Sequence, residues 1–237
     1  MEWLQRTEIL LGEEKLLKLQ KAHVLIVGLG GVGAYAAEMI ARAGVGHLTI
    51  IDGDVVQPGN RNRQLPALTS TQGLNKSDVV AARLRDINPD IQLNVLNEFL
   101  KDERIPEILN HPYDYVVDAI DTLSPKVFLI VNALQQNHPL ISSLGAGGKM
   151  DPSQVRVDDI SKTYNCNLAR MVRKRLTKFG VRKGFKVIFS PELVNRDAII
   201  LAEDEEYKKT TVGTISYMPA IFGCFLAAEV IRDLINR

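Results

Sequence analysis

Six residues, Gly28-Leu-Gly-Gly-Val-Gly33, constrain most strongly what this chain can fold into. They follow the apolar run His23 to Val27, typical of a buried strand, and precede the alanine-rich stretch Ala34 to Ala43, typical of a helix. A second apolar run, His47 to Ile51, comes next. A strand, a glycine turn, a helix and another strand form a unit whose two strands are parallel.

The same alternation continues along the chain and predicts the fold class. Helices are predicted at 77–86 and 125–136, and strands at 91–96, 115–120 and 139–143. We therefore expect an α/β fold with a Rossmann-like, doubly wound and mostly parallel sheet. An amphipathic helical segment is expected before it, over 1–20. From 149 onward we expect an irregular C-terminal extension with a strand at 186–190, a polar loop at about 202–213 and an apolar helix at 219–235.

Composition excludes several classes of protein. The chain has 237 residues, 46% of them hydrophobic, which is too many for a disordered chain and enough for a core without disulfides. No apolar run reaches the roughly 18 residues of a membrane-spanning helix, and the N-terminus does not resemble a secretory signal. We expect a cytoplasmic protein with no membrane partner. Cys166 and Cys224 form no CxxC pair, so free structural thiols are expected rather than a zinc site.

The glycine turn also predicts nucleotide binding. Gly28, Gly30, Gly31 and Gly33 leave room for a phosphate beside the backbone at a helix N-terminus. Asp52 lies 19 residues beyond Gly33, at the end of the second strand, where a carboxylate accepts hydrogen bonds from ribose hydroxyls. From these residues alone, a purely structural turn and a nicotinamide-dependent dehydrogenase are open alternatives.

A polar, cationic segment favours ATP chemistry over hydride transfer. Asp52-Gly-Asp54 leads into Asn60-Arg-Asn-Arg-Gln64, and Lys76 follows before the next helix. An enzyme that attacks the α-phosphate of ATP must stabilise negative charge on that phosphate and on the departing pyrophosphate, for which Arg and Lys are suited. A solvated surface loop is the alternative interpretation.

Two carboxylates, Asp118 and Asp121, close the strand predicted at 115–120. Magnesium prefers one or two carboxylates together with phosphate oxygens, so this pair is a candidate site for the ion. Alternatively, Asp118 caps the turn and Asp121 caps the helix that begins near Pro125. The residues alone leave both interpretations open.

A basic stretch from 170 to 186 contains eight basic residues and no acidic ones. The net charge of the chain is +1, so the rest of the chain carries −7. Such segregation favours contact with a phosphate backbone, and a solvated helix face is the alternative. If the stretch is helical, Arg170, Lys174 and Lys178 form one stripe on that helix. The eight residues are Arg170, Arg173, Lys174, Arg175, Lys178, Arg182, Lys183 and Lys186.

Taken together, these motifs resemble the adenylating domain of the ubiquitin-activating-enzyme-like superfamily. The matching segments, in order, are Gly28 to Gly33, Ala43-Gly-Val-Gly46, Ile51-Asp-Gly-Asp54, Asn60 to Gln64, Lys76 and Asp118-Ala-Ile-Asp121. Further segments are similar to the tRNA threonylcarbamoyladenosine dehydratases within that superfamily. These are Arg6-Thr-Glu-Ile-Leu-Leu-Gly12, Ile87-Asn-Pro89, Gly145-Ala-Gly-Gly-Lys-Met-Asp-Pro152 and Gly213-Thr-Ile-Ser-Tyr-Met-Pro219.

The resemblance implies a single adenylating domain over 1–237. Its nucleotide-binding core would span about 20–150, and its part from about 151 to 237 would bind tRNA and form a dimer. ATP and magnesium are the implied cofactors, and a sulfur-relay protein is a further candidate partner. Arg6 would reach the phosphates of the neighbouring subunit, which implies a homodimer.

The implied ATP-site residues are Gly28, Gly30, Gly31, Gly33, Asp52, Asp54, Asn60, Arg63, Gln64 and Lys76, with Asp121 for magnesium. The implied tRNA contacts are Arg170, Arg173, Lys174, Lys178, Arg182 and Lys183.

The activity that the resemblance implies is the ATP-dependent cyclisation of N6-threonylcarbamoyladenosine beside the anticodon of tRNA. The threonyl carboxylate would be adenylated, and the urea linkage of the modification would then close the ring. An alternative is an adenylyltransferase that activates the C-terminal glycine of a small sulfur-carrier or ubiquitin-like protein; the missing CxxC pairs and the basic stretch argue against it. A non-catalytic nucleotide-sensing or RNA-binding module would bind ATP without releasing pyrophosphate. Neither cysteine is expected to form a thioester.

Overall fold

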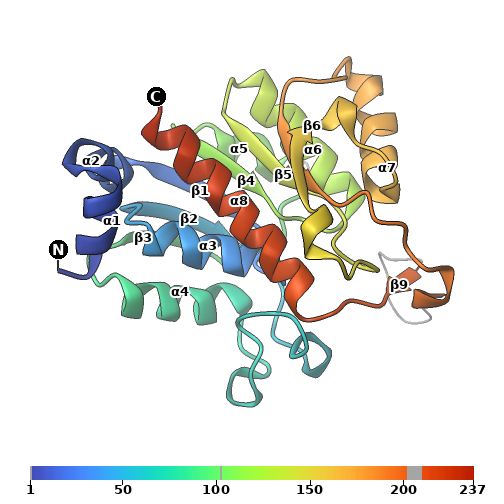
Figure 1. Cartoon of the computed structure of the whole chain (residues 1–237), viewed down its shortest axis with the longest axis horizontal. Coiled ribbons are helices and arrows are strands. Elements are labelled where there is room, and N and C mark those ends of the chain that lie inside the picture. The colour runs from blue at the N-terminus through green and yellow to red at the C-terminus, as the bar shows by residue number, and fades with distance from the viewer. Residues whose placement is uncertain (1, 102, 202–209) are drawn as a thin grey trace.

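A seven-stranded sheet forms the centre of the computed structural model, which describes residues 2–101, 103–201 and 210–237 (Figure 1). The strand order is β3-β2-β1-β4-β5-β7-β6. All neighbouring strands are parallel except β6 and β7, which are antiparallel. The bounds are β1 His23–Val27, β2 His47–Ile51, β3 Gln92–Leu96, β4 Tyr115–Asp118, β5 Leu140–Ser143, β6 Arg156–Asp159 and β7 Lys186–Phe189. A separate hairpin pairs β8 Ile199–Leu201 with β9 Thr210–Val212.

Helices cover both faces of the sheet. Helices α3, α4 and α8 pack on one face, and α5, α6 and α7 pack on the other (Figure 1). The α-helices are α1 Gln5–Leu11, α2 Glu13–Lys21, α3 Gly33–Arg42, α4 Lys76–Ile87, α5 Arg104–Leu109, α6 Leu123–Gln135, α7 Asn167–Leu176 and α8 Tyr217–Ile235. Short 3-10 turns lie at Glu2–Leu4, Pro58–Asn60, Thr69–Thr71, Pro152–Gln154, Ile160–Lys162, Thr177–Phe179 and Arg196–Ala198.

Strand β1, in the interior of the sheet, shows why the inner strands have continuous apolar sequences. Val24 and Ile26 pack into the hydrophobic cluster with α3 and α8, whereas Leu25 and Val27 pack into the cluster with α5 and α6. Side chains alternate between the faces of a strand, so a strand buried on both faces needs an apolar residue at each position. The predicted α/β fold with a mostly parallel sheet is confirmed.

The sequence missed several elements. Helices α5 and α7, strand β6 and the β8–β9 hairpin were not predicted. The strand expected at 186–190 is confirmed as β7, and together with β6 it extends the main sheet into the region expected to be irregular. Strand β6, Arg-Val-Asp-Asp, lies at the sheet edge, where polar residues weaken the strand pattern. The expected loop at 202–213 ends in β9, and its residues 202–209 lie outside the described part of the chain. Among the described residues, no helix combines the length and hydropathy needed to cross a bilayer.

Candidate active site

The glycine turn joins the carboxyl end of β1 to the start of α3. Gly28 has a φ of +90°, a conformation that favours glycine, and a Cβ there would lie 2.8 Å from the carbonyl oxygen of Ala119. A Cβ on Gly33 would lie 1.7 Å from the carbonyl oxygen of Gly28. No side chain fits at either position. The turn therefore presents bare backbone at a helix N-terminus, as phosphate binding requires.

Asp52 holds this turn from the end of the neighbouring strand β2. The backbone N–H of Leu29 donates to Asp52 Oδ2 at 2.6 Å, and the N–H of Asp54 donates to Oδ1 at 2.8 Å. Burial raises the pKa of Asp52, while the Leu29 N–H and the charge of Lys76 oppose that rise. A carboxylate has about four lone-pair sites, so acceptor capacity remains for a ribose hydroxyl.

Lys76 opens α4 and is almost fully buried. Its Nζ donates to Asp54 Oδ2 at 2.8 Å, and the side chain of Asp54 is half exposed. The next residue, Ser77, donates from Oγ to the carbonyl oxygen of Asp52 at 3.2 Å. The structure thus brings Lys76 and Asp54 together and ties the start of α4 to the end of β2.

The polar segment 57–64 folds back against the glycine turn. The side chain of Asn60 accepts from the N–H of Gln57 at 3.0 Å, which stabilises the short 3-10 turn there. Arg63 Nη1 donates to the carbonyl oxygen of Gly59 at 2.9 Å. Gln64 lies close to Gly30, where an added Cβ would be 3.7 Å from Gln64 Nε2.

Gln64 provides a test of whether a nucleotide fits this site. Its Oε1 is buried and has no hydrogen-bond partner among the described residues. A buried oxygen without a donor costs free energy, so it fits a ligand that donates a hydrogen bond. The ribose hydroxyls and the adenine amino group of ATP are such donors.

Of the two carboxylates after β4, the structure assigns one to the fold. Asp118 is fully buried, its Oδ1 accepts from the N–H of Ile120 at 3.1 Å, and its Oδ2 pairs with Lys126. Asp118 is therefore the turn cap that the sequence offered as one alternative, and it is not positioned as a metal ligand. Asp121, in contrast, is exposed at the carboxyl edge of the sheet.

A C-terminal segment closes on the glycine turn, which the sequence did not predict. A Cβ on Gly31 would lie 3.0 Å from Cβ of Pro219, in the first turn of α8. A Cβ on Gly223 would lie 2.5 Å from the carbonyl oxygen of Val32. Only resemblance to the family had singled out the segment 213–219. The one sequence signal for this contact is Gly223, where α8 closely approaches the start of α3.

Arg6 lies at the end of the sheet opposite to the glycine turn of the same chain. It is exposed on α1, two residues after Leu4, and a Cβ on Gly44 would lie 3.1 Å from Cδ1 of Leu4. Gly44 precedes β2, so this contact places the N-terminal segment at the amino ends of the strands (Figure 1). The glycine turn and Asp52 lie at the carboxyl ends.

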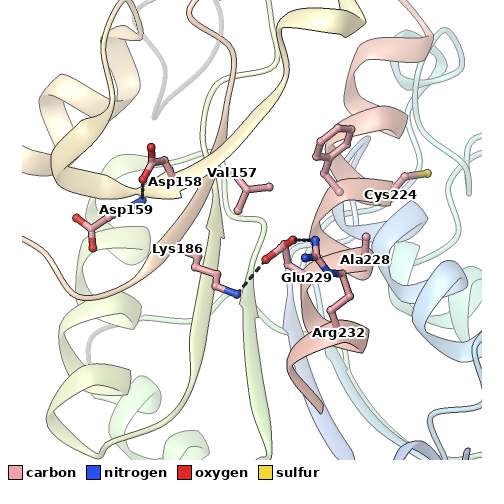
Figure 2. Close-up of a pocket in the computed structure, with 9 residues that line it drawn as sticks. Val157, Asp158, Asp159, Lys186, Cys224, Ala228, Glu229 and Arg232 are labelled. Atoms are coloured by element: carbon pink, nitrogen blue, oxygen red, sulfur yellow. Dashed lines mark hydrogen bonds and ion pairs between the residues drawn. The ribbon is translucent and has the colours of Figure 1, made fainter. Parts of the chain in front are cut away.

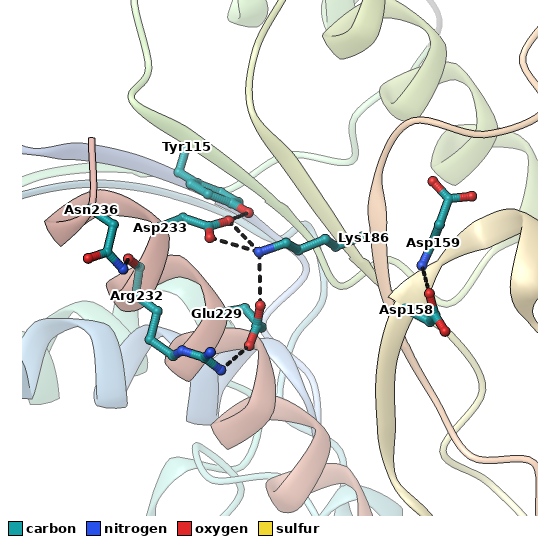
Figure 3. A network of polar contacts seen from close by, with 8 residues as sticks. All are labelled: Tyr115, Asp158, Asp159, Lys186, Glu229, Arg232, Asp233 and Asn236. Carbon is teal, nitrogen blue, oxygen red and sulfur yellow. Dashed lines mark hydrogen bonds and ion pairs between the residues drawn. The ribbon is translucent and has the colours of Figure 1, made fainter.

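The basic stretch divides into two groups. Six residues are exposed on α7 and the segment after it: Arg170, Lys174, Arg175, Lys178, Arg182 and Lys183. Arg173 instead donates from Nη1 to the carbonyl oxygen of Thr163 at 2.9 Å. Lys186 forms ion pairs with Glu229 at 2.9 Å and Asp233 at 2.7 Å, in a network that also includes Tyr115 (Figure 3).

A separate groove of about 710 Å³ lies between β6, β7 and α8 (Figure 2). Val157, Ala228 and Glu229 contribute to its walls, and none of its lining residues belongs to the glycine turn or to the segment 52–64. Cys224 lies at this groove and is exposed, whereas Cys166 is buried; both thiols are free.

Comparison with known proteins identifies the family. The model of the ThiF family matches residues 4–237. The tRNA threonylcarbamoyladenosine dehydratase of Bacillus subtilis is 38% identical over 238 residues, covering 98% of this chain and 94% of the relative. The Escherichia coli enzyme of the same name is 43% identical over 188 residues, covering 78% and 70%.

A solved structure agrees with the sequence comparison. The crystal structure of E. coli tRNA N6-threonylcarbamoyladenosine dehydratase, TcdA, in complex with ATP matches with a TM-score of 0.91 at 35% identity, over 99% of this chain and 94% of that one. The chain therefore belongs to the ThiF family and, within it, to the tRNA threonylcarbamoyladenosine dehydratases.

Proposed function

We propose that this protein catalyses the ATP-dependent cyclisation of N6-threonylcarbamoyladenosine in tRNA. The observation that carries the proposal is the grouping of the glycine turn, Asp52, Lys76 and Gln64 at one edge of the sheet. This edge is where α/β proteins bind their ligands. The names of relatives that match nearly the whole chain supply the substrate.

The mechanism needs charge neutralisation and positioning more than acid–base chemistry. The glycine turn and Asp52 would hold ATP, with Asp54, Asn60 and Gln64 around it. The threonyl carboxylate of the tRNA attacks the α-phosphate, and pyrophosphate departs to leave an acyl-adenylate. Arg63 and Lys76 would offset the negative charge that builds during this step. A nitrogen of the same urea linkage then attacks the acyl carbon and expels AMP, and its tethering gives it a high effective concentration.

Asp121 would hold magnesium against the phosphates, because this ion binds through one or two carboxylates plus phosphate oxygens. When bound, the ion neutralises phosphate charge. The role of Asp118 as a turn cap supports this choice, since it leaves Asp121 as the carboxylate of the pair that is exposed.

Arg6 supports a homodimer as the active form. The glycine turn of the same chain lies at the other end of the sheet from Arg6. Arg6 would therefore have to reach the phosphates bound by a second copy of the chain. The part from 151 to 237 would supply tRNA contacts and the dimer surface within one adenylating domain. We place the enzyme in the cytoplasm with its tRNA substrate, with a sulfur-relay protein as a further candidate partner.

The exposed residues Arg170, Lys174, Lys178, Arg182 and Lys183 would contact tRNA phosphates. Arg173 would act with them indirectly, because its hydrogen bond to Thr163 fixes α7 against the preceding turn. Phosphate contacts set orientation, while specificity would come from the unstacked bases of the anticodon loop.

ATP–pyrophosphate exchange and AMP formation test the proposal, measured with tRNA that carries threonylcarbamoyladenosine and with tRNA that lacks it. We expect turnover with the modified tRNA alone, together with the loss of one water from the nucleoside by mass spectrometry. Asp121→Ala should abolish both. Exchange with a carrier protein but with neither tRNA would instead identify an adenylyltransferase.

A further inference from the structure

A fully buried ion pair lies next to the segment that carries Asp121. Lys126 on α6 and Asp118 at the end of β4 are both 0% exposed, and Lys126 Nζ lies 2.6 Å from Asp118 Oδ2. The same Nζ donates to Ser142 Oγ at 3.2 Å and to the carbonyl oxygen of Ser143 at 2.8 Å. An ammonium group has three donors, and all three have acceptors here. Lys126 therefore joins the ends of β4 and β5 to the start of α6.

Asp118 transmits this constraint to the glycine turn. Its other oxygen, Oδ1, accepts from the N–H of Ile120 at 3.1 Å, which fixes the turn after β4. Within that turn, Ala119 donates its N–H to the carbonyl oxygen of Val27 at 2.9 Å. The carbonyl oxygen of Ala119 also packs so closely on Gly28 that a Cβ there would be 2.8 Å away. The backbone before Asp121 is thus held between the ion pair and the glycine turn.

Stability alone does not account for a charged pair at this position. Buried ion pairs can often be replaced by apolar residues of similar volume with no loss of stability, because desolvation offsets much of the attraction. The pair does provide directional bonds that define where the turn lies. Apolar packing at the same place would not fix the Ile120 N–H or the carbonyl oxygen of Ser143.

We propose that Lys126 is a positioning residue for the adenylation site. Through Asp118, it holds the backbone from Ala119 to Asp121 against the glycine turn and so sets how the two sides of the nucleotide site face each other. The inference rests on the proposed function, since it gives Lys126 a part in binding ATP with magnesium and in the adenylation step.

Two variants and a control test this role. Lys126→Met leaves a buried carboxylate without its partner and should lower the unfolding temperature. Asp118→Leu/Lys126→Met replaces both charged side chains by apolar ones of similar size, so that no buried charge is left unpaired and the acceptor of the Ile120 N–H is removed; we expect it to keep the fold. Tyr115→Phe is the matched control, because Tyr115 lies at the other end of β4, is 2% exposed, and would lose its 2.7 Å hydrogen bond to Asp233. For each protein we would measure the unfolding temperature, the dissociation constant of MgATP by calorimetry, and the rate of pyrophosphate exchange with modified tRNA.

The double variant should unfold within a few degrees of the wild type, yet bind MgATP more weakly and react more slowly. We expect a rate loss of about 10²-fold, the order that a misplacement of about 1 Å causes. Tyr115→Phe should keep the wild-type dissociation constant and rate. A double variant with wild-type binding and rate would show that the pair only stabilises the fold, and would overturn the proposal.

Failure of the proposed function would be distinguishable from failure of this inference. If the wild type binds MgATP but does not act on the modified tRNA, the proposed function falls, and the dissociation constants alone decide the role of Lys126. A wild type that binds no MgATP overturns both.

Discussion

The backbone N–H of Leu29 donates a 2.6 Å hydrogen bond to the carboxylate of Asp52, and this bond joins the glycine turn to the end of β2. Asp52 thus has a structural task in addition to the ribose contact expected of it. The two tasks are compatible because Leu29 and Asp54 use one lone pair on each carboxylate oxygen.

Asp52→Ala should weaken both the fold and nucleotide binding. The substitution leaves two backbone N–H groups without their acceptor, which costs about 1–3 kcal/mol for each that stays buried. Asp52→Asn keeps one acceptor oxygen and should lose less. Urea unfolding and MgATP calorimetry measure the two effects, with Asp90→Ala at an exposed site as the control. Wild-type ATP affinity in Asp52→Ala would contradict this role.

Two glycine substitutions should show whether ATP binding depends on the close backbone packing of the glycine turn. Gly33→Ala places a Cβ 1.7 Å from the carbonyl oxygen of Gly28, so the turn must open and ATP binding should be lost. Gly59→Ala, in the neighbouring polar segment, meets nothing within 4 Å and should bind ATP like the wild type. Equal ATP affinity in the two variants would refute the proposed phosphate contact with the turn.

Neutralising exposed basic residues on α7 and the 3-10 turn after it should weaken tRNA binding and reduce its dependence on salt. In the triple variant Arg170→Ala/Lys174→Ala/Lys178→Ala, each lost phosphate contact should reduce the slope of log affinity against log salt by about 0.7 to 0.9. Filter binding over a series of salt concentrations measures the slope. The control, Lys15→Ala/Lys18→Ala/Lys21→Ala, removes three charges from α2 and should leave the slope unchanged.

Acid should destabilise the protein through His23. Burial and the adjacent His47, whose ring stacks at 3.4 Å between centroids, lower the pKa of His23 from 6.5 to about 4, and Asp114 only partly opposes them. Between these values the unfolded chain binds more protons than the folded chain, so stability rises with pH across this window and is lost on acidification. His23→Gln should flatten the profile between about pH 4 and 6.5 in urea unfolding. An unchanged slope would exclude His23 as the cause.

Replacing the cysteines should not stop the reaction. The proposed mechanism closes a ring within the substrate and uses no thiol, and Cys224 lies at the groove beside α8 rather than at the glycine turn. Cys224→Ser should therefore retain the wild-type rate of AMP formation. Cys166→Ser should retain it once the assay temperature is well below its unfolding temperature, since Cys166 is buried. A covalent adduct between either sulfur and the substrate would contradict this mechanism.

Local patterns in the sequence determined the parallel sheet and the position of its ligand edge. The runs His23 to Val27 and His47 to Ile51 predict strands because both faces of a central strand are buried, so each position must be apolar. The glycine turn could be predicted because close approach of the backbone excludes side chains at fixed positions. Asp52 could be predicted from its place at the end of the second strand. These signals lie within about thirty residues of one another, as in other βαβ units.

Tertiary structure alone decided which charged side chains are bonded within the fold and which are exposed. The sequence does not distinguish the roles of Asp118 and Asp121. In the structure, Asp118 is buried and bonded to Lys126 on α6 and Ser142 on β5. Lys186 belongs to the basic stretch by sequence, but Glu229 and Asp233 on α8 neutralise it. The contacts of Pro219 and Gly223 with the glycine turn were not predicted from the sequence either, because the two segments are almost two hundred residues apart. In each case the partner is distant in the chain, and only the packing of helices on the sheet brings it within bonding distance.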